Sequence, residues 1–221
     1  MIDRFQALIP QSLMETSGSV FYSGRSAFGE PSKLYILGLN PGGSPQEQAG
    51  ETINWHTRKV LTGPAKWSAY ADERWKGKLP GTHGLQPRIL HLLNSLHLDS
   101  RCVPSSNVVF VRSAREAGID RSFSILAEMC WPFHQAVIEK LGVRVVLCFG
   151  QRSGDWVCSK LDAVSCVDRF VENNNRRWSS NAFMNRNGLA VVVATHPSIA
   201  DWTVSETDPS PLMQRVLQRM G

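Results

Sequence analysis

Four short stretches of the chain are apolar at nearly every position, and each is bounded by turn-forming residues. They cover residues 34–39, 108–111, 143–149 and 189–194. Runs of this kind, in place of alternating apolar and polar positions, are expected where a strand is covered on both faces, as in a parallel sheet. The pattern therefore predicts a central sheet of four mainly parallel strands.

Apolar stripes at helical spacing lie between these runs. One stripe follows Pro87, a second runs from 125 to 141 and is interrupted by Pro132, and a last one begins at Pro211. Alternating strands and helices favour a three-layer α/β/α sandwich, with helices on both faces of the sheet. The chain has no internal repeat and no low-complexity tract, so we expect residues 1–221 to form a single domain.

In folds of this class, ligands bind beyond the carboxyl ends of the strands. That rule selects two loops, residues 40–45 after the first apolar run and residues 195–202 after the last one. Both loops hold polar side chains among prolines and glycines, which stop a strand from continuing. We expect the functional site to form where these two loops meet.

Composition limits the possible classes of protein. The 221 residues are 42% hydrophobic and 19% charged, which is typical of a globular domain and excludes a disordered chain. A formal charge of +5 favours an anionic partner. The chain has no run of roughly 18 apolar residues and no basic start followed by an apolar core, so neither a membrane span nor a signal peptide is expected.

The five cysteines include no C-x-x-C pair, and the six histidines show no H-E-x-x-H spacing. We therefore expect a cytoplasmic protein without a metal site, in which all five cysteines are packing residues. The glycines of residues 38–43 could also indicate a phosphate-binding loop of a nucleotide-binding enzyme. The segment lacks the G-K-[ST] ending and the G-x-G-x-x-G spacing of such loops, so this interpretation is weak.

Positive charge gathers in two stretches. Residues 58–78 hold six Lys or Arg against two acidic residues, with aromatic residues between them, and residues 169–186 hold four Arg against Glu172. Basic groups mixed with aromatic rings suit a nucleic-acid surface, because cations neutralise phosphate and rings stack on bases. The first stretch belongs to a basic, aromatic-rich insert at about 50–84. The alternative is that this insert is only solvated and that its tryptophans cover the core.

The segment Gly38-Leu39-Asn40-Pro41-Gly42, paired with His196-Pro197-Ser198, resembles the uracil-DNA glycosylase superfamily. The first motif is similar to the mismatch-specific and single-strand-selective branches, and the second is shared with the single-strand-selective and the most widespread branches. Ser106-Asn107-Val108-Val109 and residues 145–150 look like the second and third strands of that family. The resemblance covers about residues 33–200.

This resemblance implies a hydrolase of base excision repair that removes a deaminated or damaged base, above all uracil, from DNA. The base must leave the duplex before its N-glycosidic bond can be reached. Asn40 matches the residue that positions water, and its amide oxygen can orient a water molecule without taking a proton. His196 matches the residue that donates a hydrogen bond to the leaving base. Alternatively, Asn40 only stabilises the turn before Pro41.

Recognition of the base would fall to Gly38, Leu39, Pro41, Gly42 and a second-strand asparagine. Asn107 matches that asparagine, although a different alignment would put Arg112 or Ser113 in its place. An amide offers both a donor and an acceptor, which suits uracil. For stacking on the flipped base, the resemblance implies an aromatic ring after the first motif, with Trp55 as first candidate and Trp67 as second.

The resemblance also implies DNA contacts around the second motif. Pro197 and Ser198 would grip phosphate, and either Ile199 or Trp202 would enter the space left by the flipped base. Lys59 and Lys66 would contact the backbone, whereas Asp201 is an awkward charge beside phosphate. The cysteines do not match the spacing of the iron-sulfur branch, so no cofactor is expected.

We expect a monomer that acts on DNA and has no membrane partner. Competing readings are a related protein that binds nucleic acid or a nucleobase without excising uracil, and an enzyme that acts on another base such as hypoxanthine.

Overall fold

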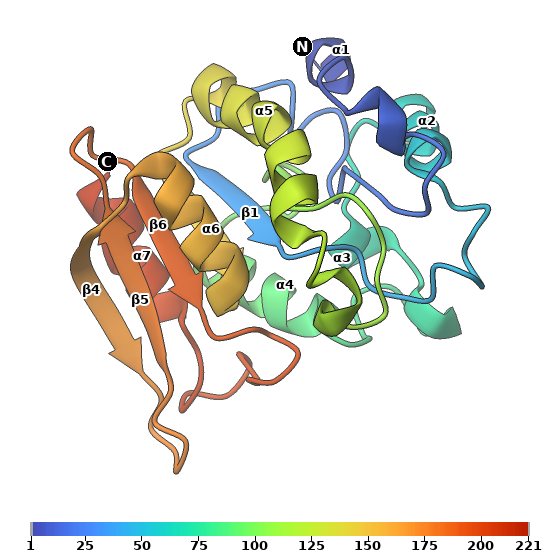
Figure 1. Ribbon diagram of the computed structural model, residues 1–221. Helices are drawn as coiled ribbons and strands as arrows, with labels where there is room; N and C mark the ends of the chain where they lie inside the picture. Colours follow the sequence, from blue (N-terminus) through green and yellow to red (C-terminus); the bar gives the residue numbers. More distant parts are fainter. Residues whose placement is uncertain (1, 221) are drawn as a thin grey trace.

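The computed structural model describes residues 2–220, which form an α/β fold around one mixed sheet (Figure 1). The sheet has six strands in the order β2-β1-β3-β6-β5-β4, and the first four of these run parallel. The last two are antiparallel to their neighbours. The strands are β1 (Leu34–Gly38), β2 (Ser105–Asn107), β3 (Val145–Phe149), β4 (Ser165–Val171), β5 (Ser179–Met184) and β6 (Ala190–Ala194).

The prediction of a four-stranded sheet was therefore incomplete. Strands β4 and β5 form a hairpin at one edge, and they lack a continuous apolar run because most of their side chains are exposed or only half-buried. Such strands escape a search for segments buried on both faces. The arginine-rich stretch 169–186 is largely this hairpin, so it is part of the sheet.

The apolar run 108–111 does not form the strand that its composition predicts. Strand β2 ends at Asn107, and the next two residues continue as a buried connection whose N–H groups donate to Gly38 and Leu39. Each of these bonds is 2.9 Å long. The run is apolar because Val108, Val109 and Phe110 are buried. Its backbone groups bond to the end of β1, to Leu39 and to Ser19, and not to a neighbouring strand along a regular ladder.

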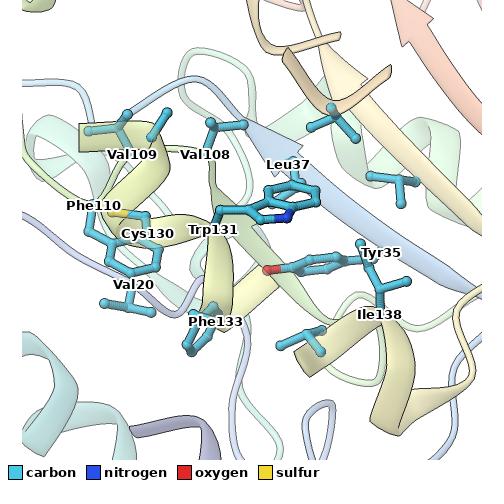
Figure 2. Packing of buried hydrophobic residues seen from close by; sticks show 14 of the residues in the cluster. Val20, Tyr35, Leu37, Val108, Val109, Phe110, Cys130, Trp131, Phe133 and Ile138 are labelled. Carbon is cyan, nitrogen blue, oxygen red and sulfur yellow. The ribbon is translucent and has the colours of Figure 1, made fainter. Parts of the chain in front are cut away.

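Among the described residues, seven α-helices accompany the sheet. The residues of β1 alternate between two apolar clusters: Tyr35 and Leu37 belong to one, and Leu34 and Ile36 belong to the other. Tyr35 and Leu37 share their cluster with Trp131, Phe133 and Ile138 of α5 (Figure 2). Helices thus cover both faces of the sheet. They are α1 (Ile2–Gln6), α2 (Ile53–Thr62), α3 (Ala69–Asp72), α4 (Gln86–Ser95), α5 (Phe123–Leu141), α6 (Gln151–Leu161) and α7 (Ser210–Arg219).

Helix α5 continues through Pro132, where the sequence predicts an interruption. A proline inside a helix removes one backbone hydrogen bond and crowds the preceding turn. Here the flanking Trp131 and Phe133 are both buried in the core. Their packing outweighs the local cost, since most helical stability in proteins comes from such tertiary contacts.

A buried histidine connects β1 to the segment that follows β2. The hydroxyl of Tyr35 lies 2.8 Å from Nδ1 of His134, and Nε2 lies 3.2 Å from the carbonyl oxygen of Val108. A carbonyl can only accept, so Nε2 carries the proton and Nδ1 accepts from the hydroxyl. Burial lowers the pKa of His134 to about 4, which keeps the ring neutral.

Two observations bear on the remaining expectations from composition. No helix within residues 2–220 is long and apolar enough to cross a membrane. Cys130 and Cys148 are buried as expected, but Cys102 and Cys166 are exposed and so are not packing residues.

Candidate active site

The carboxyl ends of the parallel strands open into one cleft of about 1460 Å³. Both loops selected from the sequence contribute to its lining, through Asn40 after β1 and His196 after β6. The ends of β2 and β3 contribute Asn107 and Phe149. Parallel strands bring these residues together because their carboxyl ends lie at the same edge of the sheet.

Asn40 holds its side chain in a defined orientation. Its Nδ2 donates to the carbonyl oxygens of Pro41, at 2.9 Å, and of Ser113, at 3.3 Å. Two acceptors on that side require the amide nitrogen to face them. The nitrogen therefore stabilises the turn at Pro41, which was the alternative role considered for Asn40. The described residues supply no donor to Oδ1. That oxygen is the atom left to accept a hydrogen bond from water.

The tautomer of His196 follows from its neighbour. Nδ1 accepts from the backbone N–H of Ser198 at 3.0 Å and lies 2.7 Å from the hydroxyl oxygen of the same residue. A backbone N–H can only donate, so Nδ1 is unprotonated and Nε2 carries the proton. Burial lowers the pKa of His196, which favours this neutral form. Ser198 thus orients the imidazole.

Gly150 closes one side of that imidazole. Its φ of +85° is a conformation that side chains other than glycine rarely adopt, and the position where its Cβ would lie is 3.5 Å from Cβ of His196. On another side, the ring of Phe149 meets the imidazole edge to face, with centroids 6.2 Å apart. Phe149 and Gly150, at the end of β3, thus hold the imidazole of His196 in place.

Asn107 brings an unsatisfied donor to the cleft. Asn107 is only 6% exposed, and its Nδ2 is buried without a hydrogen-bond partner in the described part of the chain. An unpaired buried donor costs about 1–3 kcal/mol, so proteins rarely keep one without a function. The alignment that placed Asn107 at the end of the second strand agrees with the position of β2.

The two alternatives to Asn107 also line the cleft, but their polar groups are occupied. Arg112 donates to the carbonyl oxygen of Gly42 at 2.6 Å and to Oε2 of Glu51 at 3.0 Å. The hydroxyl of Ser113 donates to the carbonyl oxygen of Arg115 at 2.6 Å. Arg112 therefore holds the loop after β1, and Asn107 is the residue with a free donor.

The two aromatic candidates separate clearly. Trp55, in the first turn of α2, is 46% exposed and lines the cleft, and Nζ of Lys59 lies 5.3 Å from its ring centroid. Trp67 packs against the core beside His56 and does not line the cleft. The structure therefore favours Trp55 for stacking on a base.

The two candidates for the side chain that enters the space left by the flipped base differ in burial. Ile199 is 54% exposed at the cleft, whereas Trp202 is fully buried. The indole of Trp202 donates to the carbonyl oxygen of Thr195 at 3.1 Å and packs edge to face on Phe149. Trp202 cannot enter DNA without leaving the core, so its predicted DNA contact was wrong.

The loop around the second motif is tied down by one arginine. Arg88 of α4 donates to the carbonyl oxygen of Pro197 and lies 3.4 Å from a carboxylate oxygen of Asp201. Hydrogen bonds from Thr203 lower the pKa of Asp201, with a smaller contribution from Arg88. The charge that looked awkward beside phosphate is thus paired within the protein.

The charged residues of the cleft lining are mainly basic. Lys59 contributes to the lining, although it also pairs with Glu73 at 3.0 Å, whereas Lys66 is exposed outside the lining. The basic side chains of the lining are Lys59, Arg74, Lys76, Arg88, Arg112, Arg115, Arg152 and Arg177, and the acidic ones are Glu51, Glu73 and Glu116. Several of these basic residues lie outside the two stretches selected from the sequence. The excess of basic over acidic residues in the lining therefore arises mainly because the fold brings distant residues together.

Sequence reasoning missed two aromatic residues of the cleft. Tyr22 reaches it from the chain before β1, its hydroxyl accepts from Ser19, and burial raises its pKa. No motif marked it. Trp178 reaches the cleft from the β4–β5 hairpin. It belongs to the arginine-rich stretch 169–186. An aromatic residue among basic residues, the pattern noted in residues 58–78, could have identified it.

No protein-family model matches the chain, and a search of curated proteins found no relative with significant similarity. Within residues 2–220, no group of three or more His, Cys, Asp or Glu side chains is placed to hold a metal ion. The function must therefore be inferred from the side chains of the cleft.

Proposed function

We propose that the protein is a DNA glycosylase of the uracil-DNA glycosylase type, which hydrolyses the N-glycosidic bond of a uracil flipped out of DNA. One observation carries the proposal: Oδ1 of Asn40 and the Nε2–H of His196 are both left for a ligand in the same basic cleft. Under this proposal the fold is the three-layer sandwich of that superfamily, and the protein acts as a monomer in base excision repair.

The proposed reaction begins with the flipped nucleotide in the cleft. The bond between the sugar C1′ and the base N1 breaks, and its electron pair leaves with the uracil, so positive charge develops on the sugar. The Nε2–H of His196 donates to a carbonyl oxygen of the departing base. A preorganised donor of this kind is typically worth about 3 kcal/mol in the transition state.

Water completes the reaction. Oδ1 of Asn40 accepts a hydrogen bond from a water molecule and directs its oxygen toward C1′. The new C1′–O bond forms as the sugar loses its positive charge, and the extra proton of the water passes to solvent. Since an amide cannot take that proton, catalysis depends on charge stabilisation and orientation more than on general-base strength.

Asn107 would select the base. Its unpaired Nδ2 is a donor, which matches the O4 carbonyl of uracil, and its Oδ1 can accept from N3–H. Cytosine presents the reverse pattern, with an amino group at the fourth position and an acceptor at N3. A donor held in this place would therefore favour uracil over cytosine.

The test uses single-stranded, U:G and U:A oligonucleotides with purified protein. We expect an alkali-labile abasic product, and we expect Asn40→Ala and His196→Ala each to lower its formation by orders of magnitude while thermal melting stays nearly unchanged. If no uracil substrate is cut at micromolar protein, uracil excision is wrong. A parallel panel with hypoxanthine and other altered bases then tests the wider glycosylase proposal.

A further inference from the structure

The β4–β5 hairpin adds a wall to the cleft that the four parallel strands alone would not provide. Because β5 is antiparallel to β6, its first residues lie beside the last residues of β6, with Asn181 paired to Val193. The hydroxyl of Ser180 accepts from the N–H of Thr195 at 3.0 Å, directly before His196. In Figure 1 the hairpin extends beyond the sheet in the direction in which β6 points.

Trp178, the last residue before β5, presents its ring at this wall. The residue is 44% exposed and lines the cleft. The guanidinium carbon of Arg176 lies 4.4 Å from its ring centroid, so a cation covers one face of the indole. The exposure of Trp178 leaves part of the residue accessible to a ligand in the cleft.

Arg176 is fixed by partners on both sides. Its Nη2 donates at 3.0 Å to Oε2 of Glu172, a carboxylate that is almost completely buried. Its Nη1 donates at 2.7 Å to the carbonyl oxygen of Ile199, in the loop that follows His196. The arginine thus ties the hairpin, and the tryptophan under it, to the proposed catalytic loop.

The tip of the hairpin is also held in shape. Oδ1 of Asn174 accepts from the N–H groups of Arg176 and Arg177, at 3.0 and 3.2 Å, and its Nδ2 donates to Glu172. The backbone N–H of Glu172 donates to the carbonyl oxygen of Trp178 at 2.8 Å. A ring that is fixed before binding loses little entropy when a base stacks on it.

The cleft has room for more than one nucleotide. Its volume of about 1460 Å³ exceeds the range of about 300–1,000 Å³ that is usual for small-molecule sites. Trp55 on α2 and Trp178 on the hairpin are two exposed rings in its lining, and each has a cation beside it. Aromatic rings within a basic groove are the usual means of binding single-stranded nucleic acid.

We infer that Trp178 is a second stacking platform, which holds an unpaired base next to the flipped uracil and so makes single-stranded DNA the preferred substrate. The inference rests on the proposed function for the identity of the flipped base. In a duplex, the neighbouring base remains paired and stacked within the helix, so it cannot reach the ring.

The experiment measures binding of fluorescein-labelled single strands that carry one 2′-fluoro-2′-deoxyuridine, whose fluorine opposes positive charge on the sugar and so blocks cleavage. A series of strands replaces one flanking base at a time by an abasic spacer. We expect the wild-type protein to lose affinity by about tenfold when the base on Trp178 is missing. Trp178→Ala should show that loss with the intact strand and no further loss with the spacer.

Two further variants sharpen the comparison. Trp178→Phe keeps a smaller ring and should bind with intermediate affinity. Val171→Ala changes an exposed side chain of the same hairpin that does not line the cleft, and it should bind like the wild type. Affinity for a fully paired duplex should change by less than about twofold in Trp178→Ala, since no neighbouring base is free to stack.

The outcomes separate the two proposals. If Trp178→Ala binds all strands like the wild type, or loses affinity equally with every spacer position, the platform is wrong even where uracil is excised. If no uracil is excised but the loss still couples Trp178 to one flanking base, the platform stands and the glycosylase proposal fails.

Discussion

Gly38 leaves the space that the side-chain amide of Asn107 occupies. The two residues are paired in register on β1 and β2, and a Cβ on Gly38 would lie 2.2 Å from Oδ1 of Asn107. Non-bonded carbon and oxygen atoms do not approach so closely. The glycine of the first motif and the asparagine of the second strand therefore form one structural unit.

Gly38→Ala should push the Asn107 amide out of place. We expect uracil excision to fall by about tenfold or more, because the donor for the base is displaced, and thermal melting to fall as the strands adjust. Gly50→Ala is the control, since its Cβ would meet no described atom within 4 Å and the residue does not line the cleft. Equal activity of the two variants would refute the role of this contact.

Asn40→Asp should not create a faster enzyme. The carboxylate oxygen that replaces Nδ2 would face the carbonyl oxygens of Pro41 and Ser113, which both need a donor. We expect a loss of about 1–3 kcal/mol in the free energy of unfolding, measured by urea denaturation, together with lower excision. An aspartate variant that is both stable and faster would contradict the orientation of the Asn40 amide, with Nδ2 toward the two carbonyls.

The acid side of the pH profile should reflect the environment of His196. Its pKa is lowered from the usual 6.5, so the neutral ring with the proton on Nε2 persists below that pH. Protonation of Nδ1 would break the hydrogen bond from the backbone N–H of Ser198, which can only donate, and would reverse the one with the hydroxyl. We expect single-turnover excision to stay constant down to pH 6.5 and to fall only at lower pH. The residual activity of His196→Gln should lack this fall.

His134 should make folding stability sensitive to acid. Its pKa is about 4 in the folded protein and about 6.5 in the unfolded chain, so only the unfolded state binds the proton between these values. Its contribution is fully present above pH 6.5 and is lost as pH falls toward 4, by up to about 3 kcal/mol.

Denaturation curves at several pH values check this expectation. Burial also lowers the pKa of His56 to about 4, so the wild type has more than one source of acid sensitivity. The difference between the wild type and His134→Gln isolates His134. That difference should shrink as pH falls from 6.5 to 4, and a difference independent of pH would contradict the buried neutral ring.

The parallel core of the fold could be predicted from the sequence because its strands are buried on both faces. The run 34–39 became β1, 143–149 contains β3, and 189–194 contains β6. The predicted strand at 108–111 was wrong, because these residues follow β2 as a largely buried connection and are not part of a strand. The β4–β5 hairpin was missed because one strand lies at the edge of the sheet and neither has a continuous apolar run.

The site, too, could be predicted from the sequence only in part. Asn40 and His196 could be selected because short motifs follow predicted strands, and the topology brings both to one cleft. Burial is a property of the whole fold, so the sequence could not separate the exposed Ile199 from the buried Trp202, or Trp55 from Trp67. Trp178 lay in a stretch selected only for its charge, and the antiparallel pairing of β5 with β6 is what brings it to the cleft.

The most direct test of the central proposal is the release of the free base. A single-stranded oligonucleotide with one uracil is incubated with the protein, and free uracil and abasic sites are both quantified by mass spectrometry. We predict equal amounts of the two products with the wild-type protein and almost none with His196→Ala. Intact oligonucleotide without free uracil, at protein concentrations that bind it fully, would contradict the proposal.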